Sequence, residues 1–325
     1  MSGEIKITFW GVRGSYPTPG PSTVHYGGNT SCVEITADGE TIILDAGTGM
    51  IGLGRELAYR HRGKPVEANI FFSHMHHDHS QGFRFFNPIH MPSTEINIFG
   101  PEVHECNPED VLAHTMHPAS FPLNFHNLRA QTDSYTLEDG DAVLLQNGEK
   151  TILRGASKWA ESPESGILVR TMRSDTHPGG VMFYRIESQG RAIVYATDTE
   201  RTFANDHQLI QFARGADLLI HDAQYTEEHY EGRQLGFPCT RGWGHSTPSM
   251  ACDVARAAQV KQLALFHYEP GYDDKMIADI ERKARTRFAN TIAPYEGMTI
   301  ALAPVEEETI HQHTHAHATV LWSAS

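Results

Sequence analysis

The chain has 325 residues, 39% hydrophobic and 20% charged, which is the composition of an ordinary globular protein with one large core. Its formal net charge of −14, with histidines neutral, argues against broad binding to a nucleic-acid backbone, which needs a cationic surface. No apolar run reaches the roughly eighteen residues of a membrane span, and no secretion signal begins the sequence, so a cytoplasmic location is expected.

The first part of the chain consists of short apolar runs separated by turn residues. Asp38-Gly39 is a strong two-residue hairpin signal, and Asp45 follows the second strand of that hairpin. The segment 11–22 is rich in glycine and proline and is expected to be a loop. These patterns predict strands over 5–9, 31–36 and 41–44 and a helix over 49–62.

A dense group of metal-ligating side chains follows the next apolar run, which predicts a buried strand over 69–72. The group comprises His74, His76, Asp78 and His79. Because side chains alternate along an extended chain, the rings of His74 and His76 can point the same way, and a helix is expected from near Ser80. Three imidazoles and one carboxylate suit a divalent ion such as zinc, whereas the alternative is a surface histidine cluster or a polar turn.

The segment 101–130 differs from its surroundings, because it is rich in proline, histidine and aromatic residues and has weak periodicity. Asn107-Pro108 fits a helix start, and 114–123 is typical of an irregular loop. We interpret the segment as an insertion that could cover a site. Its histidines are expected to be polar loop residues and not ligands: His104, His114, His117 and His126.

Strands dominate both halves of the chain, and each half ends with helices. No low-complexity linker divides it, so we expect a single domain over 1–325 with two packed sheets and outer helices. The histidine-rich tail 306–325 is expected to be a strand with one histidine-lined face, a metal-catching tail or a segment without a role. The later predicted elements are strands over 95–99, 166–171, 181–187, 192–196, 217–220, 262–266 and 299–303, and helices over 250–259 and 273–288.

Three further candidate ligands stand where a predicted strand meets a loop. His177 precedes the strand that starts at Val181, Asp198 follows the strand over 192–196, and His267 closes the strand over 262–266. A two-metal hydrolase needs a third histidine for one metal, a carboxylate between the metals and a final histidine for the other. Strands that converge at one edge of a sheet would bring these residues together.

The order His-x-His-x-Asp-His after a hydrophobic strand, at residues 74–79, resembles the signature of the metallo-β-lactamase superfamily. The resemblance extends over about residues 5–303 and implies an α/β fold, a four-layer αββα sandwich, and a dinuclear metal-dependent hydrolase. Asp45 would support the site through hydrogen bonds without binding metal. The two divalent ions would be zinc, with manganese or iron as alternatives. The implied metal ligands are His74, His76, Asp78, His79, His177, Asp198 and His267.

The aspartate at 198, where true β-lactamases have cysteine, resembles the phosphodiesterase branch that includes tRNase Z and the PhnP-type cyclic phosphodiesterases. In that branch a histidine in a Gly-His-Ser context contacts the phosphate and protonates the leaving oxygen. This is the catalytic role implied for His245, which could instead cap the helix starting at Thr247. Asp222 is expected as the acidic partner of that histidine, and Asp78 as a ligand that also orients the nucleophile.

The predicted function is hydrolysis of a small phosphodiester, with a cyclic nucleotide as the first choice, by a metal-bridged hydroxide. The alternatives are a metal-dependent hydrolase of a thioester, lactone or lactam, a tRNase Z-like RNA-processing nuclease, and a non-catalytic or redox member of the fold. Because the chain is acidic and lacks a basic arm, no extended nucleic-acid binding is expected, and no membrane contact. A homodimer is common in relatives and is the default expectation.

Overall fold

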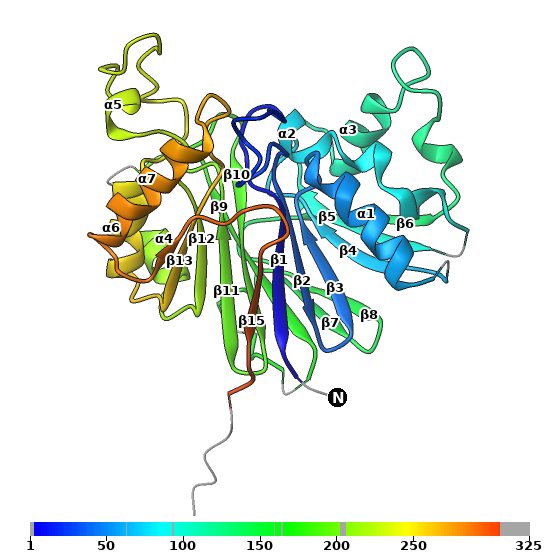
Figure 1. The fold of residues 1–325 in the computed structure, drawn as a ribbon. Helices are drawn as coiled ribbons and strands as arrows, with labels where there is room; N and C mark the ends of the chain where they lie inside the picture. The colour runs from blue at the N-terminus through cyan, green and yellow to red at the C-terminus, as the bar shows by residue number, and fades with distance from the viewer. Residues whose placement is uncertain are drawn as a thin grey trace, which may run out of the picture.

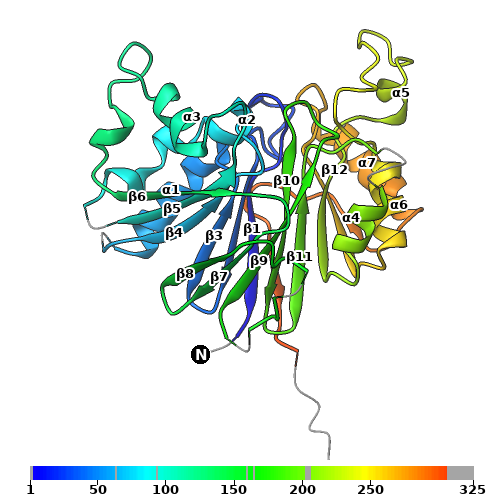
Figure 2. The ribbon, with the colours of Figure 1, turned by 180° about the vertical axis from the view of Figure 1, so that it is seen from behind.

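The computed structural model describes residues 3–62, 64–92, 94–158, 160–163, 165–201 and 206–305. Two β-sheets lie face to face, and helices cover the outer face of each (Figures 1 and 2). The predicted histidine-rich tail lies outside the described residues. Among those described, none of the helices has the length and apolar character that crossing a bilayer requires.

The first sheet is mixed, because β1 pairs antiparallel with β15 and β2, whereas β3 to β6 run parallel. Along β1, Ile5, Ile7 and Phe9 are buried and Lys6 is exposed, which is the period-two pattern of a strand with one face in the core. Seven strands follow the order β15-β1-β2-β3-β4-β5-β6. Their bounds are β1 Ile5–Gly11, β2 Cys32–Ala37, β3 Glu40–Leu44, β4 Glu67–Phe71, β5 Glu95–Pro101, β6 Gln131–Leu137 and β15 Thr299–Leu302.

The second sheet is parallel from β11 to β14 and antiparallel from β8 to β11. All five residues of β12 are buried, as expected for a parallel strand covered on both faces. Eight strands follow the order β14-β13-β12-β11-β10-β9-β7-β8. Their bounds are β7 Ala142–Gln146, β8 Glu149–Leu153, β9 Ile167–Ser174, β10 Val181–Ser188, β11 Arg191–Ala196, β12 Leu218–Asp222, β13 Gln262–Phe266 and β14 Thr291–Ile292.

Helices α3, α6 and α7 begin at residues whose side chains cap them. Asn107 and Asp110 form a reciprocal capping box at α3, and Thr247 and Asp273 accept backbone hydrogen bonds at the starts of α6 and α7. Helices α1 and α3 lie on the first sheet, and α4, α6 and α7 lie on the second (Figure 1). Their bounds are α1 Gly49–Arg60, α2 His77–Ser80, α3 Pro108–Thr115, α4 Asp206–Phe212, α5 Glu227–Tyr230, α6 Pro248–Ala257 and α7 Asp274–Arg285, with 3₁₀ turns at Phe83–Phe85, Asn87–His90 and Phe125–Asn127.

Apolar side chains form two buried clusters. The larger lies between the sheets, where it contains Phe9 and Ile193, and continues under α6 and α7, where it contains Val254 and Ile277. The smaller lies between the first sheet and its helices and contains Leu53 and Ile70. Each sheet is thus covered by apolar side chains on the face it shares with the other sheet. This arrangement is a four-layer αββα sandwich.

The helix predicted from near Ser80 is wrong. Helix α2 is a single turn that already contains Asp78 and His79 and ends at Ser80. The chain then passes close to the loop after β3, where Gly82 donates its backbone N–H to the carbonyl of Ala46 at 2.8 Å. A Cβ at Gly82 would lie 2.0 Å from the Gly47 carbonyl oxygen. This backbone contact diverts the chain before a longer helix can form.

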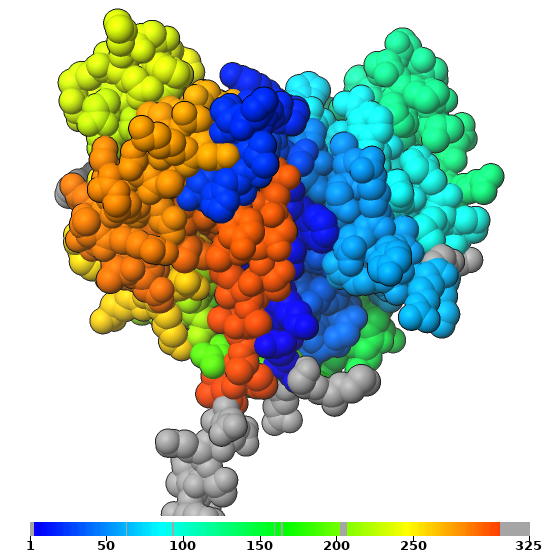
Figure 3. Space-filling model, viewed as in Figure 1, coloured from blue at the N-terminus to red at the C-terminus, as the bar shows by residue number. Residues whose placement is uncertain are grey.

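Two segments rise beside α2 at one edge of the sandwich (Figures 1 and 3). One is 101–130, which carries α3 and lies over the first sheet. The other, here called the α5 arm, is 225–243 and lies beside the second sheet. The carboxyl ends of β4, β11, β12 and β13 meet at this same edge, which is where α/β sheets place their ligand sites.

Candidate active site

A cleft of about 510 Å³ opens at this edge of the sandwich. Its volume lies within the range of small-molecule sites. Among the described residues, those of 101–130 do not contribute to its lining. The lining residues are Ser15, Met75, His76, His77, Asp78, His177, Asp198, His245 and His267.

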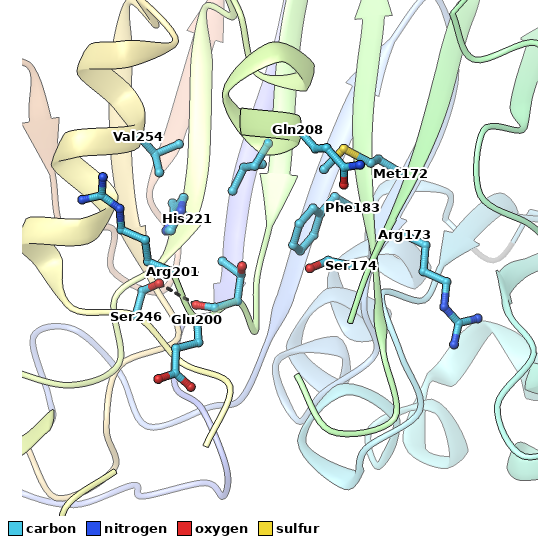
Figure 4. A pocket seen from close by; sticks show the side chains of 12 residues that line it. Met172, Arg173, Ser174, Phe183, Glu200, Arg201, Gln208, His221, Ser246 and Val254 are labelled. Atoms are coloured by element: carbon cyan, nitrogen blue, oxygen red, sulfur yellow. Dashed lines mark hydrogen bonds between the residues drawn. The ribbon is translucent and has the colours of Figure 1, made fainter. Parts of the chain in front are cut away.

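A second cavity, of about 10 Å³, has room for roughly one water molecule and is too small for a substrate. Figure 4 shows it between β9, β10 and α6, with the Ser246 hydroxyl donating to the carbonyl of Thr199 at 2.5 Å. Glu200 lies at its border, and its carboxylate is turned away from Phe183 and Val254. The chemistry therefore belongs to the larger cleft.

Three histidines form the first candidate metal cluster. Nε2 of His74 lies 2.9 Å from Nδ1 of His76, and Nε2 of His177 lies 3.1 Å from that same Nδ1. His74 and His177 are buried, whereas His76 faces the cleft. The loop after β4 and the β9–β10 turn thus supply one converging set of ring nitrogens.

Asp78, His79 and His267 form the second cluster. Nε2 of His79 lies 3.1 Å from Nε2 of His267, and Oδ2 of Asp78 lies 3.1 Å from the latter atom. All three side chains are buried. Here α2 and the end of β13 bring together residues that are 188 positions apart in the chain.

Asp198 lies between the two clusters and directs one oxygen to each. Oδ1 is 3.2 Å from Nε2 of His79 and 3.4 Å from Nε2 of His267. Oδ2 is 3.7 Å from Nε2 of both His74 and His177. The Thr197 hydroxyl donates to Oδ1 at 2.6 Å and helps to hold the carboxylate.

The protonation states of the three histidines in the first cluster favour the binding of a cation. Burial lowers the pKa of His74, His76 and His177, the last to about 4, so all three rings are neutral near pH 7. Neutral imidazole is the form that binds metal. Lone pairs that converge at 2.9–3.1 Å repel one another, and a cation among them removes that repulsion.

The carboxylates of the site are ionised. Burial opposes the charge on Asp78 and Asp198, but neighbouring histidines hold the pKa of both carboxyls well below the usual range. Burial also acts to lower the pKa of His79, but Asp198, Asp78 and Asp45 together raise it well above the ordinary value. Buried anions among histidines attract positive charge, so this donor set fits divalent cations.

Hydrogen bonds behind the clusters fix the orientation of the rings. Nδ1 of His79 lies 2.7 Å from Oδ2 of Asp45, Nδ1 of His267 lies 3.1 Å from Oε1 of Gln224, and Nδ1 of His177 lies 3.3 Å from the Gly244 carbonyl. With the proton on Nδ1, each ring turns Nε2 toward its cluster. The sequence predicts the supporting position of Asp45, but it carries no signal for Gln224.

Asp45 also accepts hydrogen bonds from Ser73, in the loop after β4, and from Tyr195 of the second sheet. The Ser73 backbone N–H donates to it at 2.7 Å, the Ser73 hydroxyl at 2.8 Å and the Tyr195 hydroxyl at 2.7 Å. Tyr195 comes from β11, so this carboxylate joins the two sheets beneath the site. We did not predict the contributions of Ser73 and Tyr195, because both are part of ordinary apolar strand patterns.

His245 and Asp222 form a pair beside the second cluster. Nδ1 of His245 lies 2.7 Å from Oδ2 of Asp222, and the ring stacks on His267 at 5.0 Å between centroids. Burial acts to lower the pKa of His245, but Asp222 outweighs it and raises that pKa to about 9. His245 also lies close enough to His177 and Asp198, and to Asp222 and His267, to share an ion with them, but because its Nδ1 is engaged with Asp222, we assign it the role of the acid and not a place in the two metal clusters.

Backbone strain gathers at this site. Asp45, Asp198 and His267 have φ of 60°, 51° and 65°, in the left-handed region that non-glycine residues rarely adopt. Ser15 shares this conformation at φ 59°, and its N–H donates to Oδ2 of Asp78 at 2.7 Å. Such conformations persist where the surroundings hold them and are typical of active sites. The sequence indicates only a loop at Ser15.

Comparisons with known proteins agree with this geometry. Residues 40–268 match the family described as Beta-lactamase superfamily domain. The chain is 28% identical to the ribonuclease Z of Thermoplasma acidophilum over 323 residues, which span 90% of this chain and 94% of that protein.

Solved structures confirm the predicted fold class. The metallo-β-lactamase fold protein YhfI of Bacillus subtilis superposes with a TM-score of 0.62 at 15% identity, over 92% of this chain and all of that one. A diphosphatase of the PhnP family gives 0.60 at 18% identity, over 91% and 97%. The short form of human tRNase Z gives 0.58 at 20% identity, over 91% and 98%.

The family match covers more than half of the chain and contains the candidate ligands from His74 to His267. The predicted superfamily is therefore confirmed. The chain belongs to the β-lactamase superfamily and is a metal-dependent hydrolase of that fold.

Proposed function

We propose that this protein is a dinuclear metal-dependent phosphodiesterase whose substrate is a small phosphodiester, with a cyclic nucleotide as the first choice. The observation that carries the proposal is the protonated His245, held by Asp222 beside two clusters of candidate ligands. An acid in this position can donate a proton to an oxygen that leaves phosphorus. The ribonuclease Z relatives support phosphodiester chemistry.

The two clusters, with Asp198 shared between them, would hold two divalent ions. We assign His74, His76 and His177 to one ion and Asp78, His79 and His267 to the other. When bound, these ions supply a water of lowered pKa and positive charge for the phosphate oxygens. Zinc is the first expectation because imidazole dominates the donor set, and manganese and iron suit the same ligands.

The chain's own residues would orient the attacking water and protonate the leaving oxygen. Asp222 keeps the proton on Nδ1 of His245, so that Nε2–H is the proton available to the cleft. The Ser15 N–H holds Oδ2 of Asp78 at 2.7 Å, on the side of the cleft that Asp78 lines. Asp78 is thereby positioned both as a ligand and to orient the attacking water.

A substrate panel tests the proposal. It comprises bis(p-nitrophenyl) phosphate, 2′,3′- and 3′,5′-cyclic nucleotides, linear dinucleotides, tRNA precursors and lactones, each assayed with zinc, manganese or iron. We expect metal-dependent cleavage of phosphodiesters and no turnover of lactones. Preferential turnover of a lactone would contradict the proposal and support a carbonyl substrate instead.

A double substitution tests the metal-ligand assignment independently of the substrate. His74→Ala with His76→Ala is expected to reduce bound metal, measured by elemental analysis, and to abolish phosphodiester cleavage. The matched control is His126→Ala, which removes a histidine of a surface segment whose side chain is 68% exposed. Full activity and metal content in the double variant would overturn the ligand assignment.

RNA-end processing is the second candidate, because the relatives named ribonuclease Z match over nearly their whole length. The net charge of −14 favours the small substrate, since a long RNA backbone requires a cationic surface. The tRNA precursors in the panel separate the two candidates.

A further inference from the structure

Trp243 is an exposed aromatic side chain next to the candidate acid. It lies two residues before His245, and half of its surface, 50%, is accessible to solvent. Single exposed apolar side chains are common on protein surfaces, but this one stands next to the candidate acid, and an indole buries a large apolar area when a planar ligand stacks on it. The mechanism above makes no use of this residue.

The exposure of Trp243 does not come from a loose loop. The buried carboxylate of Glu200 accepts the N–H of Gly242 at 2.8 Å and the N–H of Gly244 at 2.9 Å, one on each side of the tryptophan. The Trp243 N–H itself donates to the Thr240 carbonyl at 3.1 Å. The backbone is therefore fixed in advance, which lowers the entropy lost when a ligand binds.

Glu200 also ties this loop to the rest of the α5 arm. Its Oε1 accepts the hydroxyl of Tyr230 at 2.6 Å, and the guanidinium of Arg241 lies 5.6 Å from the centre of the Tyr230 ring. Tyr230 is buried beneath the loop, so the exposed groups here are the Trp243 indole and the Arg241 side chain two residues before it. In a chain of net charge −14, such a surface suits an aromatic ligand that carries negative charge.

Ring contacts connect Trp243 to the phosphodiester site. The Tyr225 ring lies edge-on to Trp243 at 6.5 Å and edge-on to His245 at 5.7 Å between centroids. The indole and the candidate acid thus flank one buried tyrosine. Trp243 does not line the cleft itself, so a group joined to a phosphate at His245 would extend past Tyr225 to reach the indole.

We propose that Trp243 is a stacking platform for a nucleobase attached to the phosphate that is cleaved. The inference rests on the proposed phosphodiesterase function and specifies its substrate class as nucleotides. Stacking on an aromatic face tolerates any base, so the site would select a nucleotide over a simple phosphodiester without selecting a sequence. Glu200 holds the platform, and Tyr225 sets its distance from His245.

Binding of adenosine 5′-monophosphate and of inorganic phosphate to the metal-loaded protein tests this proposal. Calorimetry gives each Kd, and tryptophan fluorescence reports stacking on Trp243 as the quenching that Trp243→Ala loses, because the chain has 4 tryptophans. We expect the monophosphate to bind more tightly than phosphate and to quench the fluorescence. Trp243→Ala should weaken monophosphate binding about tenfold or more and leave phosphate binding the same, whereas Trp243→Phe should retain most of the affinity.

Leu235→Ala is the matched control, because Leu235 is a 98% exposed apolar residue of the same arm. It should bind the monophosphate like the unaltered protein. Unchanged monophosphate affinity in Trp243→Ala would overturn the proposal, as would loss of a dimer in that variant, which would identify Trp243 as a protein contact. Either result leaves the proposed function intact, because cleavage of bis(p-nitrophenyl) phosphate by the unaltered protein tests that function separately.

Discussion

At the scale of single residues, neighbouring histidines of the cleft differ in protonation state. Burial lowers the pKa of His177 to about 4, whereas at His245 burial is outweighed by Asp222 together with Asp198 and Asp78, which raise the pKa to about 9. The rings of the two histidines are only 5.0 Å apart. One environment therefore yields a neutral ring suited to a metal and a charged ring suited to acid catalysis.

The first prediction concerns the pH dependence of the reaction. Because its pKa is raised, His245 is protonated below about pH 9 and loses its proton above it, so kcat should fall as pH rises through that value. Asp222→Asn removes the largest influence that raises this pKa and should move the alkaline limb to lower pH. A pH–rate profile measures the shift, with the exposed Asp279→Asn as the control. An unmoved limb in Asp222→Asn would contradict the assignment.

The second prediction concerns the proton donor itself. His245→Asn should lower kcat by about 10²–10⁴-fold, which is the usual contribution of a positioned acid, and should leave bound metal unchanged. Steady-state kinetics and elemental analysis measure the two effects. Loss of metal in this variant would instead place His245 among the ligands.

At the scale of elements, loops that approach one another closely position the candidate ligands. A Cβ at Gly14 would lie 2.4 Å from Cε1 of His267, and a Cβ at Gly244 would lie 2.5 Å from Nδ1 of His177. Only glycine leaves room for these rings. The predicted strands locate the ligands near one edge, but these loop contacts decide how the rings face one another.

The third prediction compares two glycines of one loop. Gly242 and Gly244 have φ of 84° and 89°, yet only Gly244 would bring a new Cβ against His177. Both Gly→Ala variants carry the same backbone strain, of about 1 kcal/mol or more. Gly244→Ala should in addition weaken metal binding by about 10-fold or more, because it displaces a ligand ring. Competition with a chromogenic chelator measures the affinities, and equal values for the two variants would refute the prediction.

At the scale of the whole molecule, the two sheets are joined at the site by a buried cation. Arg13 is fully buried, donates to the carbonyls of Gly27, Glu269 and Tyr272 at 2.6–3.2 Å, and connects the chain after β1 with the loop after β13. Burial lowers its pKa, but the guanidinium stays charged. The Glu269 carbonyl also accepts the Tyr272 backbone N–H at 3.0 Å, so the carbonyls of Gly27 and Tyr272 rely most on this side chain.

The fourth prediction is that Arg13→Met lowers the free energy of unfolding by about 3 kcal/mol, because it leaves those buried carbonyls without their donor. Arg256→Met, in which a 63% exposed arginine loses its ion pair with Asp253, should cost no more than about 1 kcal/mol. Urea denaturation measures both. Similar losses in the two variants would show that the burial of Arg13 is not decisive.

The fifth prediction concerns removal of metal. The candidate ligands come from the loop after β4 in the first sheet and from the ends of β11 and β13 in the second, so bound ions cross-link the sheets. Chelation should therefore lower both Tm and the free energy of unfolding. The free energy should fall by about 2.7 kcal/mol if the free metal concentration before chelation was 100 times Kd. The His74→Ala, His76→Ala variant should show a smaller change. Calorimetry with and without chelator measures the effect.

The sequence by itself determined the superfamily, most of the strands and the set of candidate ligands. The reason is that metal chemistry needs particular side chains at strand ends, and short apolar runs with turn residues mark those ends. His177, Asp198 and His267 are recognisable in this way, as is Asp45 behind them. The same local signals misplaced the helix near Ser80, because a backbone contact with the loop after β3 ends it.

Only the tertiary structure decided how these residues act together. It placed one oxygen of Asp198 toward each cluster, put Gln224 and Tyr195 behind the ligands, and set Trp243 beside the candidate acid. None of these relations has a local signature, because each depends on side chains far apart in the chain meeting at one sheet edge. The type of a residue decides whether it can bind a metal. Its pKa, ring orientation and exposure depend on neighbouring side chains, which come together only when the chain folds.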